Sequence, residues 1–173
     1  MIRYFAVTLI SVLAGASALQ AQNANPLSSE AQQAYNSIKR NLEGAAEAMP
    51  EADYDFKPTP EIRTFSALVA HVADAQTRTC SAVNGQAKQP DAASKKTKAE
   101  LVAAFKASFD ECDKAYGSLT DANATQMLPG RGGQRTKLGV LTGNTIHDNE
   151  EYGYMAVYLR LKGVTPPSSE RRR

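Results

Sequence analysis

Apolar residues recur every three or four positions in four segments of the chain, which is the spacing of one face of an α-helix. Helix-capping residues and helix-breaking glycines and prolines bound these segments. The four predicted helices begin near Ser28 or Ser29, at Thr64, at Thr97 and near Thr136, and they end before Pro50, near Asn84, near Leu119 and at Gly163. The signal for the start of the third helix is the most specific of the four, because Thr97 and Glu100 have the spacing of a capping box.

The connections between these segments predict no strand. Residues 54–60 contain two prolines and are expected to run extended. Residues 120–134 hold the sequence PGRGG, whose glycine spacing fits neither a phosphate-binding nor a dinucleotide-binding loop. No run of alternating apolar and polar residues is present, so the pattern predicts an all-α four-helix bundle over residues 22–163, followed by a disordered tail over residues 164–173.

Composition agrees with one small domain and argues against nucleic-acid binding. The chain has 173 residues, of which 42% are hydrophobic, enough for a single core. The formal net charge is +2, and the basic residues are spread along the chain except for a run at 171–173. A solvated tail explains that run, so no nucleic-acid partner is expected.

The first residues have the features of an export signal. Arg3 is followed by an apolar run to about Ala18, which is shorter than the roughly 20 residues of a transmembrane helix. Cleavage after Ala21 would leave residue 22 at the new N-terminus and the protein free of the membrane. This predicts a periplasmic or secreted protein; the alternative is an uncleaved membrane anchor.

Export changes the meaning of the two cysteines, because an oxidising compartment allows a disulfide to persist. Cys80 and Cys112 lie about 16 and 15 residues beyond the starts of their predicted helices. In an antiparallel pair of helices they would differ in height by roughly 16 Å, which exceeds the ~7 Å Cα separation of a disulfide. A Cys80–Cys112 disulfide therefore favours parallel second and third helices joined by a long crossover; the alternative is two buried free thiols.

The chain has two histidines, each in the middle of a predicted amphipathic helix. His147 and Glu151 are four residues apart and share a face of the last helix, where His71 could meet them across the bundle. Two imidazoles and one carboxylate suit Zn²⁺ and leave a coordination position open. Glu150 competes as the carboxylate, and two hydrogen-bonded structural histidines are the alternative to a metal site. Further residues near His147 in sequence that could line the site or simply pack are Asp148, Tyr152 and Tyr154.

Several segments together resemble the DinB/YfiT-like family over nearly all of the mature chain. They are YDFKPTP at 54–60, RTF at 63–65, LVAHVAD at 68–74, HDNEEYG at 147–153 and YLRLKGVTPPSS at 158–169. The resemblance implies a four-helix bundle with a long crossover between helices two and three, in agreement with the cysteine positions.

The resemblance also implies a metal site. Many family members bind Zn²⁺ or Ni²⁺ through a histidine on helix two and an H-x-x-x-H pair on the last helix. His71 and His147 match two of these ligands, whereas Glu151 stands where the family usually has histidine. Relatives include metal-dependent transferases that act with low-molecular-weight thiols.

We therefore expect an exported, divalent-metal-dependent transferase or hydrolase acting on a small molecule. The alternative is a non-catalytic binding or stress-related bundle that has lost the complete metal site. Substrate and oligomeric state are left open, and a homodimer is compatible with the sequence.

Overall fold

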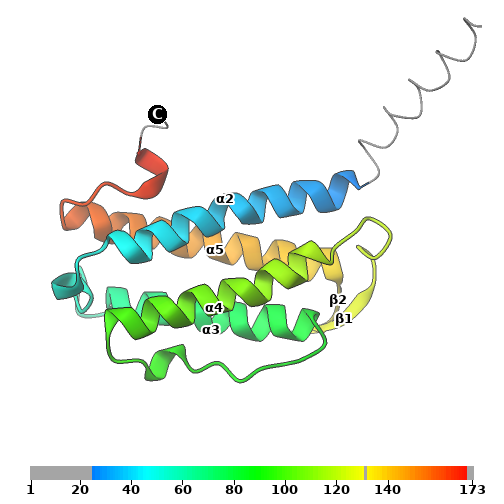
Figure 1. Cartoon of the computed structure of the whole chain (residues 1–173), viewed down its shortest axis with the longest axis horizontal. Coiled ribbons are helices and arrows are strands. Elements are labelled where there is room, and N and C mark those ends of the chain that lie inside the picture. Colours follow the sequence, from blue (N-terminus) through cyan, green and yellow to red (C-terminus); the bar gives the residue numbers. More distant parts are fainter. Residues whose placement is uncertain (1–24, 131, 171–173) are drawn as a thin grey trace, which may run out of the picture.

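The computed structural model describes residues 25–130 and 132–170. The predicted export signal, its cleavage site and the arginine run at 171–173 lie outside these residues. Four long helices form a bundle: α2 (Pro26–Ala48), α3 (Phe65–Val83), α4 (Lys98–Gly117) and α5 (Lys137–Leu161) (Figure 1). α2 and α3 each pack against both α4 and α5, which confirms the predicted four-helix bundle.

The first helix begins earlier than the sequence suggests. Asn25 is the N-cap of α2 and Pro26 occupies the first turn, where its missing N–H costs nothing. Ser28, predicted as a cap, is instead inside the helix. The carboxylate of Asp121 takes the capping role, because it accepts hydrogen bonds from the backbone N–H groups of Leu27 and Ser28 at 3.2 and 2.8 Å.

α3 and α4 run in the same direction, as the cysteine positions predict. Their C-terminal halves are joined by the Cys80–Cys112 disulfide, with a Cα separation of 4.9 Å. The crossover between them returns along the bundle through a short 3₁₀ helix at Ala92–Ser94 (Figure 1). The Thr97–Glu100 capping box at the start of α4 is complete.

The connection between α4 and α5 contains a hairpin that the sequence did not predict. β1 (Met127–Gly130) pairs antiparallel with β2 (Gly133–Thr136). Glycines at 132 and 133 have φ of 83° and 132°, which turns the chain between the strands. Four-residue strands containing proline and glycine carry no alternating pattern, so the expectation of a strand-free chain is wrong here.

The segment after α5 is ordered further than predicted. Gly163, with φ of 74°, ends the helix, and Pro167–Ser169 forms a 3₁₀ helix against α2. The hydroxyl of Tyr152 donates to Ser168 Oγ at 2.8 Å and accepts from the Ser168 N–H at 2.9 Å. Disorder from residue 164 onward is therefore a wrong expectation as far as Glu170.

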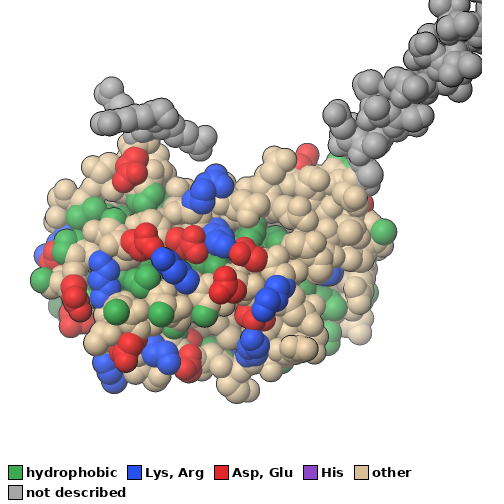
Figure 2. All heavy atoms as spheres, in the orientation of Figure 1, with side chains coloured by type: hydrophobic (Ala, Val, Ile, Leu, Met, Phe, Trp, Pro, Cys, Tyr) green, Lys and Arg blue, Asp and Glu red, His purple; other side chains and the backbone are tan. Residues whose placement is uncertain are grey.

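The bundle core is aromatic and aliphatic, and it includes a stacked pair, Tyr35 and Tyr116, with ring centroids 3.9 Å apart. On the face shown in Figure 2, side chains of both charge signs are interspersed. In the described part of the chain, no helix is both long enough and apolar enough to cross a bilayer.

Candidate metal centre

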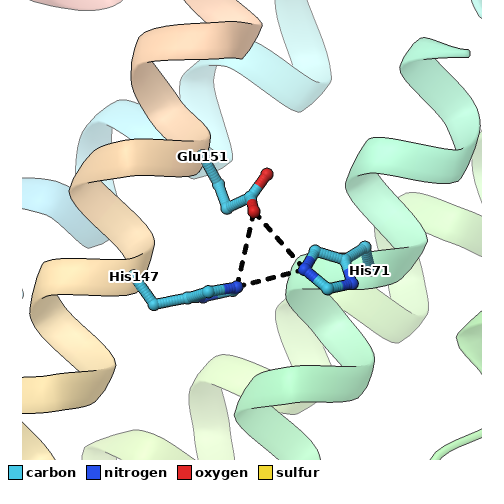
Figure 3. A group of neighbouring side chains, drawn as sticks. All are labelled: His71, His147 and Glu151. Atoms are coloured by element: carbon cyan, nitrogen blue, oxygen red, sulfur yellow. Dashed lines mark hydrogen bonds and ion pairs between the residues drawn. The ribbon is translucent and has the colours of Figure 1, made fainter. Parts of the chain in front are cut away.

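The two histidines of the chain meet between α3 and α5. His71 lies in the second turn of α3, and His147 and Glu151 lie one turn apart near the middle of α5. All three side chains point into the space between these helices (Figure 3). The four-residue spacing places His147 and Glu151 on the same face of α5, one turn apart. The packing of α3 on α5 brings His71 to them.

Three donor atoms form a nearly regular triangle. His71 Nε2 and His147 Nε2 are 3.1 Å apart, and Glu151 Oε1 lies 3.4 Å from the first and 3.5 Å from the second. Tetrahedral coordination with bonds of 2.0 to 2.1 Å separates ligand atoms by about 3.3 Å. The triangle thus has the size of one face of such a site, and the fourth position would remain open.

The Glu151 carboxylate is buried more deeply than the two imidazoles. The Glu151 side chain is 7% exposed, whereas each histidine side chain is 30% exposed. Among the described residues, Glu151 Oε2 is buried and has no hydrogen-bond partner. A buried carboxylate oxygen without a partner is costly, and a cation or an added donor would remove that cost.

The surroundings shift the two imidazoles in opposite directions. Desolvation lowers the pKa of His71, and the positive charges of Arg63 and Arg78 add to this effect, while Glu151 opposes it. The carboxylate of Asp148, with Oδ1 3.6 Å from His147 Nδ1, raises the pKa of His147 against the opposing effect of desolvation. His71 is thus biased toward the neutral form that binds metal. His147 stays protonated up to a higher pH, and it must release that proton before it can bind metal.

Asp148 is placed to orient His147. It is fully buried, and desolvation raises its pKa. Its Oδ2 accepts a hydrogen bond from Asn144 Nδ2 at 3.1 Å. Its Oδ1, which is buried and has no hydrogen-bond partner among the described residues, lies 3.6 Å from His147 Nδ1. Carboxylates in this position commonly fix the orientation of a metal-binding histidine.

The remaining residues proposed from the sequence lie elsewhere. Glu150, the alternative carboxylate, is exposed and accepts a hydrogen bond from the hydroxyl of Tyr154 at 3.2 Å. Tyr152 points toward the C-terminal segment and Tyr154 toward solvent, so neither lines the centre. The structure therefore brings together His71, His147 and Glu151, with Asp148 beside them.

The sequence did not identify the groove that reaches this centre. It has a volume of about 790 Å³, lies between α3, the hairpin and α5, and has His147 in its wall. Arg78 and Arg135 also line it. Arg78 follows His71 by seven residues, or two helical turns, and this spacing could have indicated that both residues lie on the same face of α3. Arg135 belongs to β2, so its place in the groove depends on the hairpin, which the sequence did not predict.

Comparisons with known proteins agree with this architecture. A family model described as the DinB superfamily matches residues 34–155. The crystal structure of a DinB-like protein from Bacillus cereus has a TM-score of 0.69 at 15% identity, covering 79% of this chain and 93% of that one. A DinB-like protein from Bacillus subtilis has a TM-score of 0.64 at 16% identity, with coverage of 83% and 99%. No curated protein sequence gives a match.

Proposed function

The chain belongs to the DinB superfamily, and from this premise we propose that it is an exported protein that binds one divalent ion, Zn²⁺ or Ni²⁺, through His71, His147 and Glu151. The observation that carries the proposal is the triangle of donor atoms, 3.1, 3.4 and 3.5 Å on its sides. Two imidazoles and a carboxylate are a donor set that borderline divalent ions accept.

The proposed chemistry is a metal-dependent transferase or hydrolase reaction on a small molecule. When bound, such an ion acts as a Lewis acid and makes a water molecule or thiol at the open position more acidic. His71, His147 and Glu151 would hold the ion, and the Asp148 carboxylate, 3.6 Å from His147 Nδ1, would orient the ring of His147. The groove beside His147 admits the substrate, and its volume of about 790 Å³ falls in the usual range for small-molecule sites.

Metal content is the direct test of the binding proposal. Protein purified from its natural compartment without a histidine tag should contain close to one divalent ion per chain by elemental analysis. The Glu151→His variant, which supplies the third histidine usual in the family, should retain the ion more tightly during dialysis against a chelator. A metal-free protein that also fails to take up Zn²⁺ or Ni²⁺ would favour the non-catalytic bundle.

Export is proposed on the N-terminal sequence, with the disulfide as support, because structural disulfides persist mainly outside the reducing cytosol. The intact mass of the exported protein should correspond to a chain that begins at Gln22. A mass that includes the apolar segment would instead indicate a membrane-anchored bundle.

A further inference from the structure

The groove beside His147 combines an apolar lining with two arginines. Val83 of α3, Leu128 of β1 and Val140 of α5 contribute to its walls, and none of the described residues that line it carries a carboxylate. A mostly apolar cleft with a few charged groups is typical of a site for a small organic molecule. The charge of those groups then indicates which kind of molecule fits.

Arg135 is held in place against the first turns of α5. Its Nη2 donates a hydrogen bond to the carbonyl of Gly139 at 2.7 Å. A Cβ atom at Gly143 would lie 3.2 and 3.3 Å from the two Nη atoms, so the guanidinium occupies space left by the missing side chain. Since Gly143 precedes His147 by four residues, the guanidinium lies about 6 Å from His147 along the helix axis.

Arg78 approaches the same groove from α3. It follows His71 by seven residues, which places it on the same helical face about 10 Å along the axis. In the part of the chain that the structure describes, neither Arg78 nor Arg135 forms an ion pair with a carboxylate. Two positive charges therefore face the groove on one side of the histidines, and no acidic group among its described lining residues neutralises them.

We propose that this groove binds a small organic carboxylate with an apolar body. The carboxylate contacts Arg135 and Arg78, because the planar guanidinium fork matches two carboxylate oxygens. The apolar body lies along Leu128 and Val140. Val140 precedes His147 by seven residues and Gly143 precedes it by four, so the carboxylate at Arg135 is the end of the ligand nearer His147. Any contact of that end with the metal centre rests on the proposed function; carboxylate binding itself needs only the groove.

Calorimetric titration of the disulfide-containing protein with sodium octanoate tests the inference, with octylamine as the comparison ligand. The wild-type protein should bind octanoate and not octylamine. Across the series from butanoate to octanoate, affinity should rise by up to about fourfold for each methylene that becomes buried. Octylamine binding as tightly as octanoate would overturn the proposal.

Three variants locate the carboxylate. Arg135→Gln should weaken octanoate binding about tenfold, and Arg78→Gln should weaken it by a smaller factor, because each removes a charged hydrogen-bond donor. Gly143→Ala should also weaken binding, since its methyl group displaces the Arg135 guanidinium while the charge remains. Arg40→Gln, an exposed arginine of α2 outside this groove, is the control and should bind octanoate like the wild type.

A parallel titration with Zn²⁺ separates this inference from the proposed function. Arg135→Gln should bind Zn²⁺ with wild-type affinity, because Arg135 is not a metal ligand. Octanoate affinity that is unchanged in both arginine variants, or absent in the wild type, overturns the carboxylate site whatever the Zn²⁺ result. Loss of Zn²⁺ binding in the wild type, with arginine-dependent octanoate binding intact, rejects the metal centre and supports the groove.

Discussion

The Nε2 atoms of His71 and His147 lie 3.1 Å apart, although 76 positions separate the residues in sequence. Two imidazole nitrogens this close either share one proton or bind a common cation, because two protonated rings would repel each other. Glu151 Oε1 faces both nitrogens. We take the common cation as the functional state, and its stability then depends on the charges and hydrogen bonds around these three residues.

Metal affinity should fall as the pH falls, starting above the ordinary histidine pKa of 6.5. Both imidazoles must be neutral to bind an ion, and the pKa of His147 is raised while that of His71 is lowered. Binding should therefore release one proton at pH values just below the raised pKa of His147, and two once the pH is also below the pKa of His71. Zn²⁺ titrations in buffers of different ionisation enthalpy measure this proton count; an affinity independent of pH between about 5 and 8 would be inconsistent with histidine ligands.

Asp148→Asn should weaken Zn²⁺ binding by about tenfold or more without destabilising the fold. The substitution keeps the size of the side chain but removes the negative charge beside His147 Nδ1. Because burial raises the pKa of Asp148, the ionised form costs folding free energy at neutral pH, and an uncharged amide avoids that cost. Urea unfolding and metal titration of the same variant separate the two effects; parallel losses in both would show that Asp148 has only a structural role.

Reduction of the Cys80–Cys112 disulfide should lower the free energy of unfolding by about 3 to 4 kcal/mol on the chain-entropy model. The bond closes a loop with a sequence separation of 32 that contains the crossover between α3 and α4. Urea unfolding with and without reductant gives the difference. Thiol titration of the denatured, unreduced protein is the accompanying check, and two reactive thiols per chain would contradict the bond.

Tyr152→Phe should loosen the C-terminal segment, with a loss of global stability of about 1 kcal/mol. The variant removes the hydroxyl that pairs with both Ser168 Oγ and the Ser168 N–H. Amide hydrogen exchange at Ser168 should become faster. Tyr154→Phe is a matched control, because among the described residues the Tyr154 hydroxyl forms a hydrogen bond with the exposed Glu150 alone; equal effects of the two substitutions would refute the proposed anchoring.

Features set by local sequence were predictable. The capping residues Thr64, Thr97 and Thr136 mark three helix starts because a cap acts within one turn. The helical depth of Cys80 and Cys112 was enough to indicate parallel helices. The meeting of His71 with His147 could be proposed because each lies on an amphipathic helix that must turn one face inward.

Features that depend on distant contacts were not predictable. The hairpin is held by the pairing of its two strands, and the C-terminal segment is held by a hydrogen bond from Tyr152. Neither contact leaves a local sequence signal, so both segments have the composition of loops. The position of Arg135 over Gly143 depends on the hairpin in turn. Glu150 and Glu151 could not be distinguished from spacing, because residues three and four positions away both share a helical face with His147.

The central claim is that His71, His147 and Glu151 bind one divalent ion, and calorimetric titration with Zn²⁺ and Ni²⁺ tests it most directly. The wild-type protein should bind one ion per chain, and His71→Ala and His147→Ala should each abolish stoichiometric binding. Glu151→Gln should weaken binding strongly, whereas Glu150→Gln, the same change one residue away, should leave it unchanged. Binding that persists unaltered in both histidine variants would contradict the claim and leave the two histidines with a structural role.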